Sequence, residues 1–373
     1  MILLIPGPVT TDPRVREAAA RDYAPWDQDF RALYRSVLQR ALAAAGGVEG
    51  EHSCVALQGC GHFALEAALR TLTPPGARML IAMSGQYADR AARLAREAGR
   101  EVLELPVAEG ERTDPEALRA ALAADPAIGH VLLVYSETAT GVLHDVPALA
   151  RVVGEQGRRA IVDGVSALGA APFPLAELPA VDAVVFTSNK CIEGIPGLGL
   201  VVGRVDAFEA GRGRAGSWSL DLADIHDHKT RAPGSFRFTP PAQALAAFSV
   251  ALDLWAAEGR EARLARYTAN KDALMTGLRA IGLRPMLRDA MQGPVVVNVH
   301  APADPAWDLQ RFVDALKARG FTISNFVNTA EPGFRVGCIG AITPADMTRA
   351  VAAMQGALAD IGIGALAPVA EAA

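Results

Sequence analysis

The sequence has little cysteine, no long apolar run and no excess of positive charge, and each shortage argues against a class of protein. Only four cysteines occur in 373 residues, at positions 54, 60, 191 and 338, and no two of them form a CxxC pair. This spacing disfavours a disulfide framework or a structural zinc site and favours a reducing cytoplasm. We therefore expect no metal in this protein.

The other two shortages concern membranes and nucleic acids. No stretch reaches the roughly 18 uncharged apolar residues of a membrane span. The opening letters MILLIPGP hold too short an apolar run for a signal peptide and lack a basic leader. A formal net charge of -5 argues against nucleic acid or an anionic membrane as the main partner, although a local basic pocket stays open.

What the sequence does contain indicates a soluble enzyme-sized fold. Hydrophobic residues make up 51% and charged residues 21%, which is typical of a globular protein with a sizeable core. Between residues 52 and 203, short apolar runs such as RMLIAM alternate with amphipathic stretches such as YADRAARLAREAG. The alternation predicts an α/β fold with a mainly parallel sheet covered on both faces. The link CIEGIPG is too short for a crossover, so the strand after it should run antiparallel to the strand before it.

The pattern changes near residue 241, which suggests two domains. Two long helical patterns come first, and then strand-like PVVVNVH, helix-like WDLQRFVDALKARG, strand-like FRVGCI and a last helix follow. We expect residues 1–250 to form a large domain, with the N-terminal segment contributing to the small domain or to the active-site entrance. Residues 251–373 should form a smaller α+β domain that ends in a frayed, alanine-rich tail.

Four groups stand where predicted parallel strands end, which is where open α/β sheets bind ligands. In LQGCGHFALEA a strand ends at Gln58, a glycine turn follows, and a helix begins near His62. Backbone N–H groups at such a helix start form an anion site that suits a phosphate. The spacing is neither Walker A nor GxGxxG, and a turn of this kind most often binds nothing when considered alone.

The other three groups are a carboxylate, a pair of threonines and a lysine. Asp163 ends the strand-like RAIVD, Thr138 and Thr140 follow VLLVYSE, and Lys190 follows FTSN. Taken singly, each favours a structural role as a cap, a turn or a surface charge. Taken together, a phosphate turn, a carboxylate and a lysine are the three groups that pyridoxal 5'-phosphate needs, because its aldehyde bonds to a lysine amine and its ring nitrogen pairs with an acid.

The sequence resembles the class-V aminotransferases, which are fold type I enzymes dependent on pyridoxal 5'-phosphate. The resemblance covers most of the chain, from LLIPGPVTTDPRV through LQGCGHFALEA, SGQYADR, SETATGVLHDV and VDGVSALG to FRVGCIG. The stretches SNKCIEGIPG, WSLDL and RFTPP favour the branch that acts on phosphonates. The resemblance therefore implies transfer of the amine of 2-aminoethylphosphonate to pyruvate, giving phosphonoacetaldehyde and alanine.

The same resemblance implies roles for individual residues. Lys190 and Asp163 are the expected catalytic residues, and Arg335 is expected to bind the acidic group of the substrate, with Trp26 lining the entrance. A homodimer is implied, because one residue of the cofactor-binding set would reach the phosphate in the other subunit, namely Thr239. The full expected cofactor-binding set is Cys60, Gly61, His62, Tyr87, Thr138, Asp163, Ser188, Lys190 and Thr239.

Two departures from the family pattern affect these expectations. The phosphate turn commonly reads Ser-Gly-Thr, whereas Cys60-Gly61-His62 stands here, so two hydroxyl donors become a thiol and an imidazole. We expect phosphate binding to persist through the backbone, with some pH dependence. Before Arg335 the family commonly has a Tyr-Pro-Gly-Lys-like stretch, whereas Ser324-Asn325-Phe326 stands here, and no lysine occurs between Lys317 and Arg335.

Three alternatives stay open from the sequence. The altered loop keeps an alanine–glyoxylate or serine–pyruvate type transaminase in view. A relative of the cysteine desulfurases would need a cysteine on a mobile loop near Arg335 and a histidine stacked on the cofactor ring, and the sequence has Tyr87 at the stacking position instead. A binding protein on an inactive transaminase fold is disfavoured because Lys190, Asp163 and Arg335 are all present.

Overall fold

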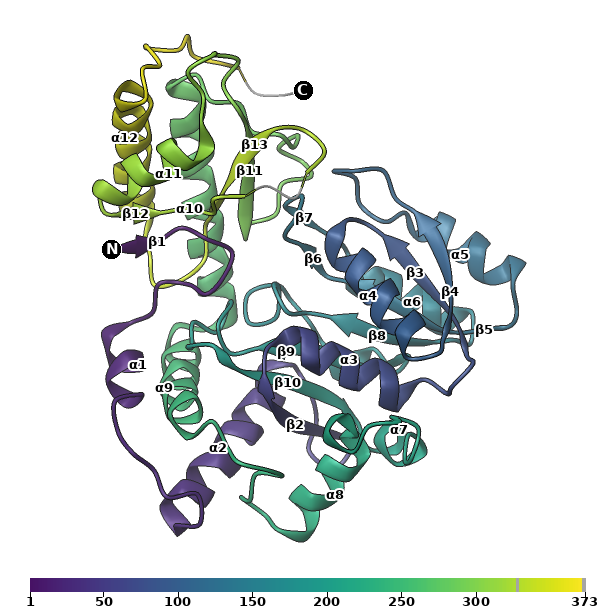
Figure 1. The fold of residues 1–373 in the computed structure, drawn as a ribbon. Helices are drawn as coiled ribbons and strands as arrows, with labels where there is room; N and C mark the ends of the chain where they lie inside the picture. The colour runs from purple at the N-terminus through teal and green to yellow at the C-terminus, as the bar shows by residue number, and fades with distance from the viewer. Residues whose placement is uncertain (327–328, 371–373) are drawn as a thin grey trace.

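The computed structural model describes residues 1–326 and 329–370, and its larger body is built on one seven-stranded sheet (Figure 1). The strands lie in the order β2-β10-β9-β8-β5-β3-β4. Neighbours are parallel except for β10, which runs antiparallel to both β2 and β9. The mainly parallel sheet and the antiparallel strand after the CIEGIPG link are thus confirmed. The strand bounds are β2 (His52–Gly59), β3 (Arg78–Met83), β4 (Glu101–Pro106), β5 (Ile128–Val134), β8 (Arg159–Asp163), β9 (Val181–Thr187) and β10 (Gly197–Arg204).

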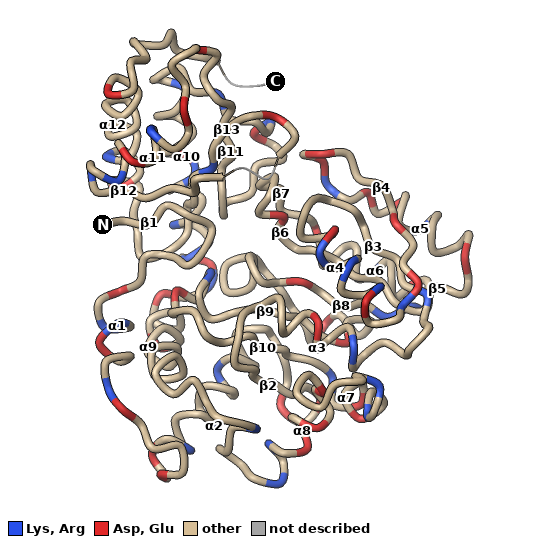
Figure 2. The backbone as a smooth tube through the Cα atoms, in the orientation of Figure 1, with Lys and Arg blue, Asp and Glu red and all other residues tan. Residues whose placement is uncertain are grey.

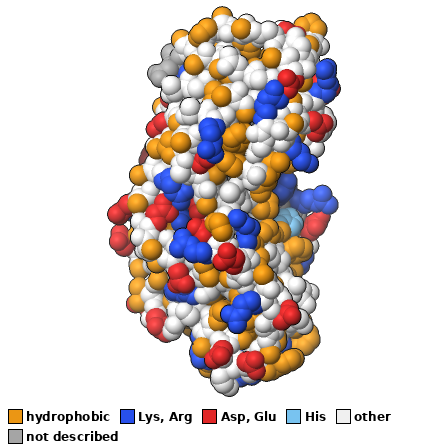
Figure 3. All heavy atoms as spheres, turned by 90° about the vertical axis from the view of Figure 1, so that its left-hand side faces the viewer, with side chains coloured by type: hydrophobic (Ala, Val, Ile, Leu, Met, Phe, Trp, Pro, Cys, Tyr) orange, Lys and Arg blue, Asp and Glu red, His pale blue; other side chains and the backbone are white. Residues whose placement is uncertain are grey.

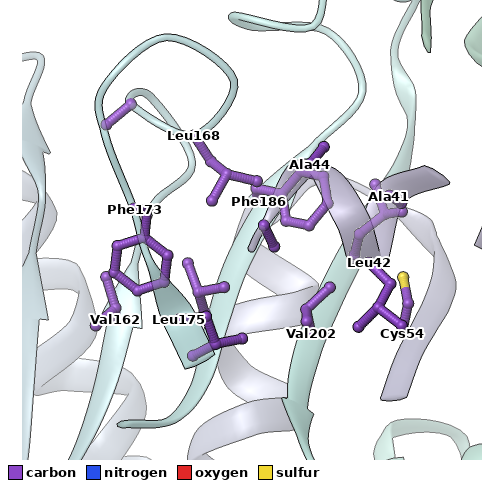
Figure 4. Packing of buried hydrophobic residues seen from close by; sticks show 14 of the residues in the cluster. Ala41, Leu42, Ala44, Cys54, Val162, Leu168, Phe173, Leu175, Phe186 and Val202 are labelled. Carbon is purple, nitrogen blue, oxygen red and sulfur yellow. The ribbon is translucent and has the colours of Figure 1, made fainter. Parts of the chain in front are cut away.

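Helices cover both faces of this sheet because its central strands are apolar on both sides. In β9, Val184 and Phe186 belong to one core, whereas Ala183 and Val185 belong to the other. Figure 4 shows part of the first core, where Phe186 and Leu42 are among the buried side chains. The helices on that face are α2 (Gln28–Ala44), α5 (Pro115–Ala124), α6 (Val146–Glu155) and α9 (Ala242–Glu258); those on the other face are α3 (Gly61–Leu72), α4 (Gln86–Glu97), α7 (Val205–Ala210) and α8 (Leu222–Arg231).

The smaller body has its own core and takes in both ends of the chain. Strand β11 (Val296–His300) pairs antiparallel with β13 (Gly333–Gly337), and the first strand, β1 (Ile2–Leu3), pairs parallel with β12 (Phe321–Thr322). Three helices complete it: α10 (Arg260–Ala280), α11 (Leu309–Ala318) and α12 (Pro344–Asp360). In the alanine-rich tail, the N–H of Val369 donates to the carbonyl of Arg279. The end of that tail, residues 371–373, lies outside the described residues.

Short elements connect the two bodies and border the sheet. They are α1 (Pro13–Ala18), the hairpin of β6 (Ser136–Glu137) and β7 (Val142–Leu143), and the 3-10 turns η1 (Leu175–Glu177) and η2 (Trp218–Leu220). Among the described residues, no helix is both long enough and apolar enough to span a membrane. On the face shown in Figure 3, acidic and basic side chains are interspersed with apolar ones, so that this face has no continuous patch of one charge.

Candidate active site

Lys190 lies just beyond the end of β9, and its amine is buried. The side chain is 9% exposed, and Nζ donates a hydrogen bond of 2.7 Å to the carbonyl of Pro6. The next residue, Gly7, has φ +142°, and a Cβ there would stand 2.6–2.8 Å from the last atoms of the lysine side chain. The N-terminal segment therefore covers the lysine closely, and only glycine leaves room for it.

Asp163 ends β8, the strand beside β9, so its carboxylate stands at the same edge of the sheet as Lys190. One carboxylate oxygen accepts a 3.0 Å hydrogen bond from the N–H of Val165. Burial raises the pKa of Asp163 to about 6, against the effects of that hydrogen bond and of the Lys190 charge. Burial likewise lowers the pKa of Lys190 to about 8. The charge of each group therefore affects the pKa of the other, although burial has the larger effect on both.

The glycine turn between β2 and α3 packs against the Asp163 turn. A Cβ on Gly61 would lie 2.5 Å from a methyl group of Val165, two residues beyond Asp163. Cys60 is the N-cap of α3 but makes no side-chain capping bond, and both Cys60 and His62 are exposed. The first turn of α3 thus lacks a side-chain cap, and a helix start of this kind suits an anion.

Arg335 comes from β13 of the smaller body and reaches the same region. Its guanidinium is buried, donates to the carbonyl of Thr138 at 3.3 Å and to Oγ of Ser324 at 3.2 Å, and lies 4.5 Å from the ring centroid of Phe326. The charge of Arg335 also lowers the pKa of Lys190, after the larger effect of burial. Ser324 and Phe326 of the altered loop therefore both contact the arginine.

A buried glutamate that the sequence analysis missed holds the aromatic residue of the site. Glu137 is fully buried, and its carboxylate accepts hydrogen bonds from the N–H of Tyr87 at 3.1 Å and of Ala139 at 3.0 Å. A Cβ on Gly85 would lie 2.7–3.0 Å from the last atoms of the Glu137 side chain. Burial raises the pKa of Glu137 to about 7. The signal in the sequence was an acidic residue inside the apolar stretch before Thr138, at the start of the turn.

Other expected site residues make different contacts. The hydroxyl of Ser188 donates to the carbonyl of Ile195 at 2.6 Å and so closes the turn after Lys190. Trp26 is 78% exposed and Thr239 is exposed. Within the described part of the chain, no hydrogen bond or ion pair joins Trp26 or Thr239 to Lys190.

Comparisons with known proteins place this site in a family. The family model Aminotransferase class-V matches residues 36–324. The chain belongs to the class-V aminotransferases. It is 44% identical to the 2-aminoethylphosphonate–pyruvate transaminase of Burkholderia ambifaria over 97% of this chain and 96% of that protein, and 40% identical to the enzyme of that name from Pseudomonas fluorescens over 97% and 98%.

Solved structures show the same fold. The pyridoxamine–pyruvate aminotransferase of Mesorhizobium loti superposes with a TM-score of 0.88 at 28% identity, covering 98% of this chain and 93% of that one. An aspartate aminotransferase of Thermus thermophilus superposes with a TM-score of 0.84 at 28% identity, covering 97% and 100%. The fold type I architecture expected from the sequence is confirmed.

The cofactor of this class-V chain is pyridoxal 5'-phosphate, and the residues present fit it. The hydroxyl of Thr138 is a buried polar atom without a partner among the described residues. Together with the α3 turn, the carboxylate of Asp163 and the amine of Lys190, it offers groups for a phosphate, a ring nitrogen, an aldehyde and a phenolic oxygen. No cluster of potential metal ligands occurs in residues 1–326 and 329–370.

Proposed function

We propose that this protein transfers the amine of 2-aminoethylphosphonate to pyruvate, giving phosphonoacetaldehyde and alanine. The observation that carries the proposal is the buried guanidinium of Arg335 beside the buried pair of Lys190 and Asp163. An arginine fork can hold a phosphonate or a carboxylate through two parallel hydrogen bonds, so one arginine can serve both substrates. The names of the relatives at 40–44% identity support this choice of substrates.

Lys190 is proposed as the catalytic amine and proton carrier. When bound, pyridoxal 5'-phosphate supplies an aldehyde and a ring that accepts electrons. Burial lowers the pKa of Lys190 to about 8, so part of this amine is neutral at physiological pH and Nζ would be able to hold the aldehyde group and to carry a proton at the substrate carbon. Asp163 would hold the ring nitrogen, because a buried carboxylate stabilises a positive charge there.

The remaining cofactor contacts are proposed from their positions. The backbone N–H groups of Cys60, Gly61 and His62 would bind the phosphate at the start of α3. Tyr87 would stack on the ring, and the unpartnered hydroxyl of Thr138 would donate to the phenolic oxygen. Ser188 supports the lysine turn through its bond to Ile195.

We also propose that the working form is a homodimer whose sites take Thr239 from the partner subunit. Three exposed aromatic residues support a second copy here. Trp218 and Phe238 pack edge to face at 5.6 Å, beside exposed Thr239, and Trp26 stays 78% exposed where it would line the entrance. Sedimentation should show a dimer, and Thr239→Val should speed cofactor loss; a monomer with full activity would disprove this assignment.

We also propose two domains, about residues 1–250 and 251–373, with the N-terminal segment contributing to the smaller one. A reducing cytoplasm fits the four free cysteines, three of them buried.

Half-reactions test the substrate assignment. The holoenzyme is mixed separately with 2-aminoethylphosphonate, alanine and serine, and the loss of the cofactor's visible band is timed. We expect rapid conversion by 2-aminoethylphosphonate and, in the reverse direction, by alanine. Conversion by amino acids alone would favour the alanine–glyoxylate or serine–pyruvate type, which the altered loop of residues 324–326 keeps in view.

A further inference from the structure

The turn after Lys190 contains a residue in an unusual backbone conformation. Glu193 has φ 62°, and among the described residues it is the one non-glycine residue with positive φ. The turn is closed by hydrogen bonds from the N–H of Glu193 to the carbonyl of Lys190 at 2.9 Å and from the N–H of Gly194 to that of Ser188 at 2.8 Å. A non-glycine residue in this backbone region is disfavoured unless its surroundings hold it there. The contacts of the Glu193 side chain should therefore show what stabilises this conformation.

Helix α10 supplies those contacts. The Glu193 carboxylate, which is 7% exposed, accepts hydrogen bonds from the hydroxyl of Tyr267 at 2.6 Å and from Nη2 of Arg266 at 2.8 Å, both to the same oxygen. Nη1 of Arg263 donates to the carbonyl of Cys191 at 2.9 Å. Three residues on one face of α10 therefore hold the turn that begins at the catalytic lysine.

The same face of α10 also holds the segment that follows β13, the strand of Arg335. Nη1 of Arg266 donates to the carbonyls of Gly340 at 2.6 Å and Ile342 at 3.2 Å. One turn further along the helix, the amide of Asn270 donates to the carbonyl of Cys338 at 3.0 Å. Arg266 is thus bonded at once to the lysine turn of the larger body and to the arginine strand of the smaller body.

We propose that Glu193 is a positioning residue whose ion pair with Arg266 sets the spacing between the amine of Lys190 and the guanidinium of Arg335. This inference rests on the proposed function, because the spacing matters most when substrates differ in length. Two carbons separate nitrogen from phosphorus in 2-aminoethylphosphonate, whereas one carbon separates nitrogen from the carboxyl carbon in alanine. A fixed spacing therefore governs the ratio of kcat/KM for the two donors.

The chain offers a matched control on the same arginines. Glu258 pairs with Arg266 at 2.7 Å and with Arg263 at 2.7 Å, but in the described structure it forms no hydrogen bond or ion pair with residues 191–193. Glu258→Ala therefore removes a carboxylate from the network and leaves the lysine turn held. Glu193→Gln keeps the oxygen that accepts from Tyr267 and Arg266 and loses only the charge, whereas Glu193→Ala removes both bonds.

Two readouts separate positioning from general destabilisation. The first is amide hydrogen exchange of the holoenzyme in peptides covering residues 188–199 and 334–343. We expect Glu193→Ala to speed exchange at least tenfold in both peptides, Glu193→Gln to restore most of the protection, and Glu258→Ala to leave both peptides as in the wild type. If Glu193→Ala does not fold, Tyr267→Phe removes one of the two bonds and should raise exchange in the same peptides by a smaller factor.

The second readout is the ratio of kcat/KM for 2-aminoethylphosphonate over alanine. We expect Glu193→Ala to change this ratio at least fivefold and Glu258→Ala to change it less than twofold. Unchanged exchange at residues 334–343 in Glu193→Ala, or an equal change of the ratio in Glu258→Ala, would overturn the proposal. A wild type that converts alanine but not 2-aminoethylphosphonate would disprove the proposed function instead, and the exchange result would still decide the role of Glu193.

Discussion

Charged side chains form an ion pair at the amino ends of strands β8 and β9, whereas those beyond the carboxyl ends are buried without one in the described part of the chain. The inner strands carry their charged residues at or next to their ends (Figure 2). At the amino ends, Arg159 forms an ion pair with buried Asp182, and His130 lies 4.0 Å from the same carboxylate. Beyond the carboxyl ends, Asp163 and Lys190 are both buried, and no ion pair joins them in the described structure.

This difference separates charges that stabilise the fold from charges that are available to a ligand. A paired buried charge has its desolvation offset by its partner, whereas an unpaired one has its pKa displaced toward the neutral form. Asp163 and Glu137 have raised pKa values, and Lys190 has a lowered one, all mainly because of burial. Several displaced pKa values close together are typical of functional sites.

The largest effect is expected from the amine at the carboxyl end. Lys190→Ala should lower the rate of the half-reaction by roughly 10³-fold or more, because proton transfer by a positioned group alone contributes about 10²–10⁴-fold. Stopped-flow absorbance with 2-aminoethylphosphonate measures it. Lys317→Ala, on a surface helix, is the control and should leave the rate within twofold. A Lys190→Ala rate near the wild-type value would mean that the proton moves through another group.

Asp163→Asn should have opposite effects on activity and on stability. The loss of the ring-nitrogen partner should lower the rate by roughly 10²-fold. In the cofactor-free chain, the pKa of Asp163 is higher than the ordinary value of 3.8, so the folded chain binds more protons between pH 4 and pH 6 and its free energy of unfolding falls as pH rises through that window.

Asparagine has no charge and removes this cost. Urea unfolding of the cofactor-free chains should show the variant more stable by about 3 kcal/mol at pH 8 and by less than about 1 kcal/mol at pH 4. If the variant and the wild type were equally stable at both pH values, burial of the Asp163 carboxylate would not destabilise the folded chain.

The sequence revealed these two charges but not what surrounds them. Asp163 and Lys190 could be placed together because parallel strands β8 and β9 end at one edge, and apolar runs mark strands well. The carbonyl of Pro6 over Lys190 comes from 184 residues away along the chain, which no local spacing shows. Glu137 was missed because an acidic residue before a turn is typical of solvent-exposed loops, whereas here backbone N–H groups satisfy it inside the core.

At the amino end, Asp182→Asn tests the other half of the comparison. The variant weakens the pair with Arg159, whose side chain is 37% exposed, so water takes up part of the loss. We expect the free energy of unfolding to fall by about 2 kcal/mol, below the 3–5 kcal/mol of a fully buried pair. Activity per folded molecule should stay within twofold. A large loss of activity without a loss of stability would mean that this end of the sheet also takes part in function.

The smallest effect is expected at the exposed start of α3, because backbone N–H groups there, and not a side-chain charge, face the proposed phosphate. His62→Gln keeps an N–H donor but loses the imidazole ring. If the imidazole helps bind phosphate, the variant should raise the dissociation constant of the cofactor about threefold. Equilibrium dialysis measures this, with Cys60→Ser as the companion that adds a hydroxyl donor and should tighten binding. An unchanged dissociation constant in His62→Gln would assign phosphate binding at this turn to the backbone N–H groups.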